Sequence, residues 1–419
     1  MNRIILIGNG FDLAHGLQTR YEDFINWYWD KWVVKLIKCN DSTLSDEICS
    51  FSIKSGRNTW SCFMYTSGYT LSPPKGVDFV NNIAEDKSLQ ITQSPLLTRI
   101  CKSIQDKNWV DIEWEYYNLL RNRMLVPGCY DYTIAELNGH LRYIQELLVQ
   151  YLSSTTNIAI NYNERIFQQI FSNIRKNDIS ISQLPAYYDY VEYLISHADD
   201  EYKFILGRYG LENSDIYFKA KELKELHKNT DTIPKTFEVT HLKDLIRPAN
   251  IMLLNFNYTG VADIYGTTKV STVNHIHGDL SNPDSIIFGY GDELDDDYKE
   301  LLKHTDKESL KNIKSIKYLE SSNYRDLLRF IESAPYQVYI MGHSCGNSDR
   351  TLLNTLFEHK NCVSIKPYYY QKEDGSDNYM EIVQNICRNF TDMKLMRDRV
   401  VNKTFCEPLT QVKNYGTTD

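Results

Sequence analysis

Short runs of aliphatic residues break the polar pattern at both ends of this chain. The first, Ile4–Ile7, stops at the turn Gly8-Asn9-Gly10. Five similar runs lie in the second half, at Ile251–Leu254, Thr272–Ile276, Ser285–Phe288, Gln337–Met341 and Cys362–Ile365. Short apolar runs of this kind, ending in glycine or polar residues, are typical of strands buried in a parallel sheet.

Helical spacing of apolar residues fills much of the remaining chain. It predicts helices over residues 21–37, 134–151, 166–174, 184–206, 219–228, 324–334 and 350–359. Residues 39–95, which include Pro73-Pro74, look like an irregular excursion. Because helices separate the later strands, the pattern predicts an α/β fold with a parallel sheet.

The order of these segments predicts the domain organisation. Residues 1–37 and 250–370 are expected to form the two parts of a Rossmann-like, doubly wound domain. Residues 38–249 would be a large, mostly helical insertion, and residues 371–419 a C-terminal segment that packs on the core.

Composition narrows the classes of function. The 419 residues include 46 Lys and Arg against 55 Asp and Glu, which gives a formal charge of −9. Sequence-independent binding of nucleic acid through a broad basic surface is therefore not expected. Nine scattered cysteines without Cys-x-x-Cys spacing argue against a zinc ribbon or redox dithiol and fit a reducing cytoplasm. Apolar runs stay well below the roughly 18 residues of a membrane span. We therefore expect a cytoplasmic protein with no metal and no membrane contact.

Ligands of doubly wound sheets bind beyond the carboxyl ends of the strands, so the residues there should converge. The first turn could present backbone amides to a phosphate, although Leu13 stands where the dinucleotide fingerprint has its third glycine. The strand ends supply amide, imidazole and carboxylate groups: Asn9, Asp12, Asn255, Asn257, His277, Asp279, His343, Ser344 and Asp349. This set suits a polar nucleotide with ribose hydroxyls.

Several motifs resemble those of the bacteriophage abortive infection protein AbiH family, in the same order along nearly the whole chain. They are Gly8-Asn9-Gly10-Phe11-Asp12-Leu13-Ala14-His15-Gly16-Leu17 with Tyr21 and Phe24, Asn108-Trp109-Val110-Asp111-Ile112-Glu113 with Tyr116, Asn255-Phe256-Asn257-Tyr258-Thr259, His277-Gly278-Asp279, and Gly342-His343-Ser344 with Asp349. The resemblance implies a role in defence against phage, with an unknown phage-derived trigger. It leaves open whether the chain forms a homo-oligomer.

The same motifs more distantly resemble sirtuin-like NAD-binding defence proteins. That resemblance implies NAD as ligand or substrate, with Asn257 and His277 as catalytic residues. The residues that would bind NAD are Gly8, Asn9, Gly10, Phe11, Asp12, Gly16, Asn255, Gly278, Gly342, His343, Ser344 and Asp349. The sirtuin zinc module is missing, and Gln18 and Tyr21 replace the family's proline and arginine, so deacylation is not carried over.

Cleavage of the nicotinamide–ribose bond is plausible chemistry for these residues. The reaction passes through an oxocarbenium-like transition state, as in glycoside cleavage. His277 could act as base, and Asn257 could hold a water or a ribose hydroxyl with one donor and one acceptor. The amides of Gly8–Phe11 would face the diphosphate. Each side chain also has a structural interpretation: a core histidine for His277, and helix caps for Asn257 and Asp12.

Other functions stay open at this point. Gly342-His343-Ser344-Cys345-Gly346 has the Gly-x-Ser-x-Gly pattern of a hydrolase nucleophile elbow, but His359, the histidine that follows it, is too near in sequence. A non-catalytic nucleotide sensor and an RNA- or DNA-directed toxin are further alternatives. Asp111 and Glu113 could serve the site or cap a helix.

Overall fold

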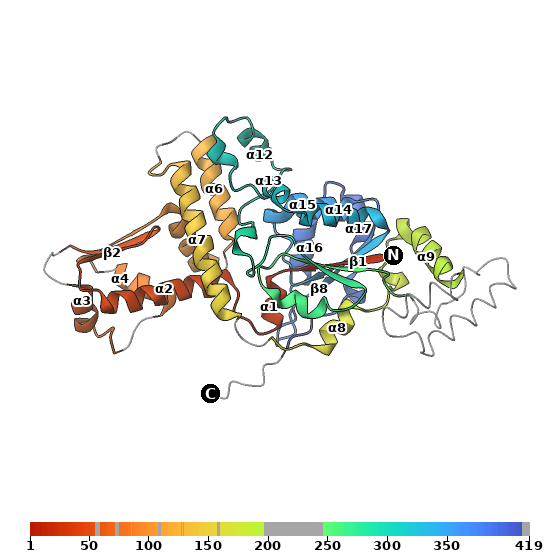
Figure 1. Cartoon of the computed structure of the whole chain (residues 1–419), viewed down its shortest axis with the longest axis horizontal. Coiled ribbons are helices and arrows are strands. Elements are labelled where there is room, and N and C mark those ends of the chain that lie inside the picture. The colour runs from red at the N-terminus through yellow and green to blue at the C-terminus, as the bar shows by residue number, and fades with distance from the viewer. Residues whose placement is uncertain are drawn as a thin grey trace. The chain divides into compact units, whose positions relative to one another are not determined.

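The computed structural model describes residues 1–54, 59–71, 75–84, 86–107, 110–126, 128, 130–156, 160–196 and 246–412 (Figure 1). The chain forms two compact units. The first, here the sheet unit, comprises Met1–Leu17, Ala159–Ile286 and Tyr318–Asp419, and the second, here the insertion unit, comprises Gln18–Ile158 and Ile287–Lys317. The unit boundaries thus lie elsewhere than the predicted boundaries at residues 37 and 249.

The sheet unit is built on five parallel strands. They are β1 (Asn2–Ile7), β5 (Ile251–Asn255), β6 (Ser271–His275), β7 (Tyr336–Met341) and β8 (Cys362–Tyr368), in the order β6-β5-β1-β7-β8. β1, β7 and β8 are buried along their whole length, which explains why most of their residues are apolar. The α/β class with a parallel sheet, predicted from the sequence, is confirmed. The strand order reverses between β1 and β7.

The strand predicted at Ser285–Phe288 is wrong. A 3-10 turn, Pro283–Ser285, ends the excursion after β6, and Ile286–Phe288 continue without a ladder partner. The three residues are buried nonetheless. Burial alone therefore produced the apolar pattern, at the point where the chain leaves the sheet unit for the insertion unit.

Helices flank the strands of the sheet unit. These are α1 (Asn9–Ala14), α8 (Glu164–Ile170), α9 (Leu184–Ser196), α14 (Asn323–Ser333), α15 (Arg350–Glu358), α16 (Tyr379–Arg388) and α17 (Met393–Arg399), with a 3-10 helix η3 (Gly260–Tyr265) between β5 and β6. The predicted helix 219–228 and the end of the predicted helix 184–206 lie outside the described residues.

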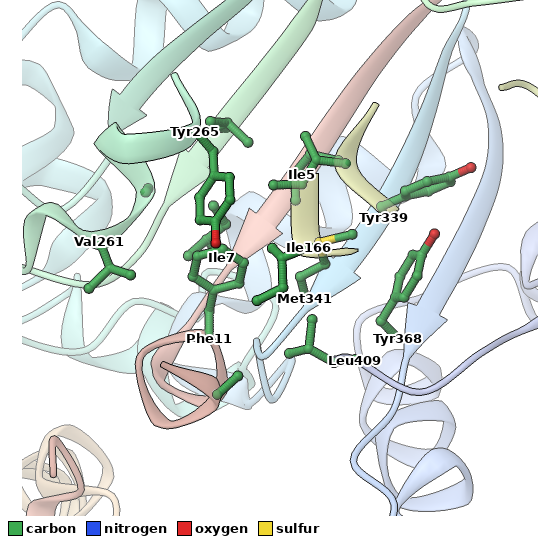
Figure 2. Close-up of a cluster of buried hydrophobic side chains, with 14 of the residues drawn as sticks. Ile5, Ile7, Phe11, Ile166, Val261, Tyr265, Tyr339, Met341, Tyr368 and Leu409 are labelled. Carbon is green, nitrogen blue, oxygen red and sulfur yellow. The ribbon is translucent and has the colours of Figure 1, made fainter. Parts of the chain in front are cut away.

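One hydrophobic cluster joins the central strands to elements distant in sequence. Figure 2 shows Ile5 and Ile7 of β1 with Met341 of β7, surrounded by Phe11, Ile166 and Tyr265. Leu409, from the C-terminal segment, belongs to the same cluster, and Val412 packs against it. The carboxyl end of β1 is therefore fixed from several sides.

The insertion unit contains both helices and strands. Its helices are α2 (Tyr21–Lys38), α3 (Trp60–Thr66), α4 (Gly76–Ala84), α5 (Pro95–Lys107), α6 (Ile112–Leu125), α7 (Ile134–Thr155), α12 (Asp296–Leu301) and α13 (Lys314–Lys317). An antiparallel sheet, β2 (Thr43–Ser45), β3 (Cys49–Ile53) and β4 (Leu89–Gln93), replaces much of the predicted irregular excursion. It is centred on Phe51, whose ring contacts Trp32 and Trp60. Within the described part of the chain, no helix combines the length and hydropathy of a membrane span.

Candidate functional site

The turn after β1 is closed by backbone hydrogen bonds. The amide of Gly10 donates to the carbonyl of Gly342 at 2.8 Å, the amide of Phe11 to Gly8 at 2.8 Å, and the amide of Gly8 to Met341 at 3.4 Å. These three amides therefore donate within the protein in this structure, and the expected role of Gly8–Phe11 toward a diphosphate stays a prediction. The acceptors of two of these bonds, Met341 and Gly342, belong to the end of β7 and the turn that follows it.

Glycines are required in both turns, because the turn after β1 and the turn after β7 approach each other closely. A Cβ on Gly8 would lie 2.6 Å from Cα of His343, and one on Gly342 would lie 2.1 Å from the amide nitrogen of Phe11. Gly342 also has a φ of +78°, in the left-handed region that favours glycine. The glycines thus allow the ends of β1 and β7 to touch.

Asn257 connects the end of β5 to the first helix. Its Nδ2 donates to the carbonyl of Gly8 at 3.0 Å and to Oδ1 of Asp12 at 2.9 Å. Because both partners are acceptors, the orientation of the amide is fixed and both hydrogens are used. Asn257 can therefore offer only its oxygen to a ligand, rather than the donor and acceptor expected from the sequence.

Asp12 is a buried carboxyl group held at the centre of this turn. It accepts from Asn257 and, at 2.6 Å, from Oγ1 of Thr259. Burial raises the pKa of Asp12 to about 7, and the two hydrogen bonds only partly oppose that rise. The Asp12 side chain does not cap α1; it ties the segment after β5 to α1.

Asn255 lies behind Asn257 and is completely buried. Its Nδ2 donates to the carbonyl of Thr259 at 3.0 Å and its Oδ1 accepts from the amide of Asn257 at 3.1 Å. His275 lies 3.2 Å from the same Nδ2 and 3.0 Å from Asp263. Burial lowers the pKa of His275, but the hydrogen bond and charge of Asp263 outweigh it, so the pKa is raised. Asn255 and His275 therefore hold the turn that follows β5 through hydrogen bonds.

His277, His343 and Asp349 form the second part of the site. Nε2 of His277 lies 3.3 Å from Oδ1 of Asp349, and Nε2 of His343 lies 3.6 Å from Oδ2 of the same carboxylate. Nε2 of His277 is also 3.2 Å from the hydroxyl of Tyr318. The side chains of His277, His343 and Asp349 are 4%, 6% and 9% exposed.

Phe256 links the two parts of the site. It stands between the two asparagines after β5, and its ring centroid lies 5.2 Å from that of His277 and 4.1 Å from that of His343. The carboxyl ends of β1, β5 and β7 and the turn after β6 therefore meet, as the sequence predicts. Thr259 and Tyr318 join them. Thr259 ends the Asn255–Thr259 motif, but no role was predicted for it. Tyr318 carries no sequence signal, because it begins the segment in which the chain returns from the insertion unit.

The Gly-x-Ser-x-Gly segment does not have the geometry of a nucleophile elbow. Ser344 is exposed, and the residue in the left-handed region is the buried Cys345, with a φ of 55°. The amide of Cys345 donates to Nδ1 of His343 at 3.0 Å, so this imidazole is engaged away from the serine. Burial raises the pKa of the Cys345 thiol. Asn385 of α16 donates to the carbonyl of Ser344, and Asn389, which follows that helix, donates to the carbonyl of Cys345, both at 2.8 Å.

The remaining expected site residues serve turns in this structure. Gly16 and Gly278 both have a φ of +78°. Gly278 passes close to Ser285, since a Cβ there would lie 2.2 Å from the Ser285 carbonyl oxygen. Asp279 accepts from the amide of Ser281 at 2.8 Å. Asn9 is exposed at the start of α1.

The acidic residues of the Asn108–Glu113 motif lie in the insertion unit. Asp111 caps α6 by accepting from the amide of Trp114 at 3.0 Å, which confirms its capping interpretation. Glu113 is buried and lies 2.8 Å from Nζ of the equally buried Lys314. Asn108 and Trp109 fall outside the described residues. Across the described ranges, no three His, Cys, Asp or Glu side chains are grouped to hold a metal ion.

Comparison with known proteins places the chain in a family. No curated protein and no solved structure matches it. Residues 4–370 match the family described as bacteriophage abortive infection AbiH. The matched range is most of the 419-residue chain and contains every strand end described above. The chain therefore belongs to the bacteriophage abortive infection AbiH family.

Proposed function

We propose that this protein is an abortive-infection effector that binds NAD at the carboxyl edge of a Rossmann-like sheet and hydrolyses its nicotinamide–ribose bond. One observation carries the proposal: Asn257 and the His277–Asp349 pair gather where the strand order reverses, which is where doubly wound sheets bind nucleotides. The AbiH family supplies the link to phage defence. The resemblance to sirtuin-like proteins supports the choice of NAD as the ligand and substrate.

The residues at this edge fit a ribose better than a diphosphate. The Asn257 oxygen is an acceptor for a ribose hydroxyl or a water, and the imidazole of His277 packs against the ring of Phe256, the residue before Asn257. The exposed Asn9 and Ser344 are polar groups at the two touching turns and would contact the phosphates, since three nearby amides are already engaged.

The proposed reaction has a simple balance. NAD contributes a ribose carbon that becomes electron-poor as its bond to nicotinamide lengthens, and the nicotinamide leaves neutral. His277 takes a proton from the attacking water, whose oxygen bonds to that carbon. Asn257 orients the water or the neighbouring hydroxyl through its oxygen. The products are nicotinamide, ADP-ribose and a proton.

The burial of His277 suits an effector that is silent before infection. Its side chain is only 4% exposed, so a dinucleotide reaches the ring only after the surrounding loops separate. We propose that a phage-derived trigger, or assembly into a homo-oligomer in the cytoplasm, brings about that opening.

The test measures nicotinamide release by the purified chain and the NAD content of cells during phage challenge. Wild type is compared with Asn257→Ala and His277→Ala, and with Asp263→Asn, which alters the exposed carboxylate beside His275, as a matched control. We expect NAD to fall in wild type and control but not in the two site variants. Unchanged NAD in wild-type cells that nonetheless stop phage growth would overturn the proposal, and loss of transfer RNA instead would establish the RNA-directed alternative.

A nucleotide sensor without turnover is the second candidate. It is favoured by the use of both Asn257 hydrogens inside the protein, which leaves an acceptor suited to recognition. Isothermal titration of NAD separates the two functions. A sensor binds NAD without releasing nicotinamide, and its signalling in phage challenge is lost in the Asn257 variant but retained in His277→Ala.

A further inference from the structure

Thr259, Asp12 and Asn257 form a short hydrogen-bonded chain in the sheet unit. Oδ2 of Asp12 lies 2.6 Å from Oγ1 of Thr259, and Oδ1 of Asp12 lies 2.9 Å from Nδ2 of Asn257. The same Nδ2 donates to the carbonyl of Gly8 at 3.0 Å. The buried carboxyl group therefore meets a hydroxyl with one oxygen and the proposed catalytic amide with the other.

The two partners of Asp12 differ in what they can do. An amide N–H only donates, so Oδ1 of Asp12 keeps a lone pair toward Asn257. A hydroxyl both donates and accepts, so Thr259 can face Oδ2 of Asp12 in either protonation state. When Asp12 is ionised, the Thr259 hydroxyl donates to Oδ2; when Asp12 is protonated, the proton lies on Oδ2 and is donated to Thr259. Oδ1 is an acceptor in both states.

Both states of Asp12 are populated near neutral pH. Burial raises the pKa of Asp12 to about 7, and the hydrogen bonds from Thr259 and Asn257 only partly oppose that rise. A site that relied on the charge of Asp12 would therefore change its properties across this range. An arrangement that relies on Oδ1 as an acceptor would not.

The reversed orientation of the Asn257 amide is unfavourable. Its oxygen would then lie about 3 Å from the Gly8 carbonyl and from Oδ1 of Asp12, two groups that offer no hydrogen. In the observed orientation both amide hydrogens are used inside the protein, and the oxygen is the atom left for a ligand. Loss of either acceptor would weaken this preference.

We infer that Asp12 is a positioning residue that orients the Asn257 amide as a hydrogen-bond acceptor and not through its charge, while Thr259 adapts when Asp12 gains or loses a proton. The inference rests on the proposed function, in which the Asn257 oxygen meets a ribose hydroxyl or a water. It adds that the site needs an acceptor at the position of Oδ1 of Asp12, whether or not that group is ionised.

Two substitutions of Asp12 separate the acceptor from the charge. Asp12→Leu removes both oxygens. Asp12→Asn removes the charge, but its amide can keep the oxygen toward Asn257 and donate from the nitrogen to Thr259. Asp263→Asn, which alters an exposed carboxylate of the same unit, is the matched control.

Nuclear magnetic resonance of the full chain with isotope-labelled asparagine provides the measurement. The side-chain amide signals of Asn257 are assigned by their loss in Asn257→Ala, and their exchange with water reports the hydrogen bonds. Asp12→Leu should speed this exchange roughly tenfold, as expected for loss of a hydrogen bond to a buried group. Asp12→Asn and the control should exchange as slowly as wild type. Exchange in Asp12→Asn as fast as in Asp12→Leu, or no change in Asp12→Leu, would overturn the inference.

A swapped pair decides the question if Asp12→Leu does not fold. Asn257→Asp places a carboxylate against Oδ1 of Asp12 and removes the donor, so the urea midpoint should fall. In the double variant Asp12→Asn/Asn257→Asp, the new amide can donate to the new carboxylate, and the midpoint should recover in part. A double variant no more stable than Asn257→Asp alone would contradict the contact.

The outcomes separate this inference from the proposed function. If exchange follows the expected order but no condition releases nicotinamide, the NAD hydrolysis fails and the positioning stands. If nicotinamide is released, Asp12→Leu should lower kcat roughly tenfold, and Asp12→Asn should restore it with the pH profile of wild type between about pH 6 and 8. Release with a pH profile that changes in Asp12→Asn contradicts the role as an uncharged acceptor, while the hydrolysis stands.

Discussion

The side-chain amide of Asn257 donates to the buried carboxyl group of Asp12 over 2.9 Å and so connects the end of β5 to the first helix. The same amide reaches the carbonyl of Gly8. The first loop of the sheet unit therefore depends on a residue about 250 positions later in the chain. Three of the following predictions concern this loop and the turn after β7 that touches it.

Asp12 should make the protein less stable as the pH rises toward neutrality. Burial raises the pKa of Asp12 to about 7, so the folded state retains a proton that the unfolded chain releases above about pH 4. Stability from this group is present below pH 4 and lost as the pH rises through 7, by at most about 4 kcal/mol. Asp12→Asn should remove this loss. Urea unfolding at pH 4.5 and 7.5 measures it, and an identical pH dependence in both proteins would contradict it.

Gly342→Ala should be much more damaging than Gly375→Ala. Both residues have positive φ, +78° and +82°, so both substitutions carry a backbone penalty of about 1–2 kcal/mol. A Cβ at Gly342 would lie 2.1 Å from the amide nitrogen of Phe11, whereas at Gly375 nothing lies within 4 Å. We expect Gly342→Ala to lower the free energy of unfolding by about 1–3 kcal/mol more than its control. Equal losses in chemical unfolding would show that the turns do not touch.

Ser344→Ala distinguishes a binding serine from a nucleophile. If Ser344 contacts a phosphate, loss of one hydrogen bond should raise KM roughly fivefold and leave kcat nearly unchanged. Steady-state nicotinamide release over a range of NAD concentrations separates the two constants. A fall in kcat by several orders of magnitude would instead restore the serine hydrolase alternative.

Lys314→Met should destabilise the insertion unit strongly. Lys314 and Glu113 are 2% and 8% exposed, so removing the ammonium leaves a buried charge, at a cost of about 3–5 kcal/mol. Lys299→Met, in the exposed pair with Asp296, is the control and should change stability by less than about 1 kcal/mol. The double variant Glu113→Gln/Lys314→Met should recover part of the loss in thermal unfolding, and no recovery would show that the pair is not coupled.

The arrangement of the sheet was predictable because its strands are buried on both faces. Mostly apolar runs such as Gln337–Met341 indicate that burial directly, and the residues that follow them had to meet at one edge. The same signal failed at Ser285–Phe288, because Ile286, Ile287 and Phe288 are buried without joining the sheet. An apolar pattern indicates that side chains are buried, but it does not show which strand, if any, the backbone pairs with.

The details of the site depended on contacts between residues far apart in the chain. Nothing local to Gly8 or Gly10 shows that their amides donate to the turn after β7. Likewise, the hydroxyl of Tyr318 reaches His277 only because the chain re-enters the sheet unit at that residue. The sequence indicated which polar groups gather, but their mutual hydrogen bonds required coordinates.

The central strand acquires its neighbours late in biosynthesis. β1 ends at Ile7, yet the strands that pair with it begin at Ile251 and Tyr336. At a translation rate of roughly 5–20 residues per second, it emerges tens of seconds before its second neighbour. A prematurely terminated chain therefore lacks the histidine and aspartate that follow β7. The pairing of β1 with β7, and the contact between the turns that follow them, is therefore completed only after most of the chain has been made.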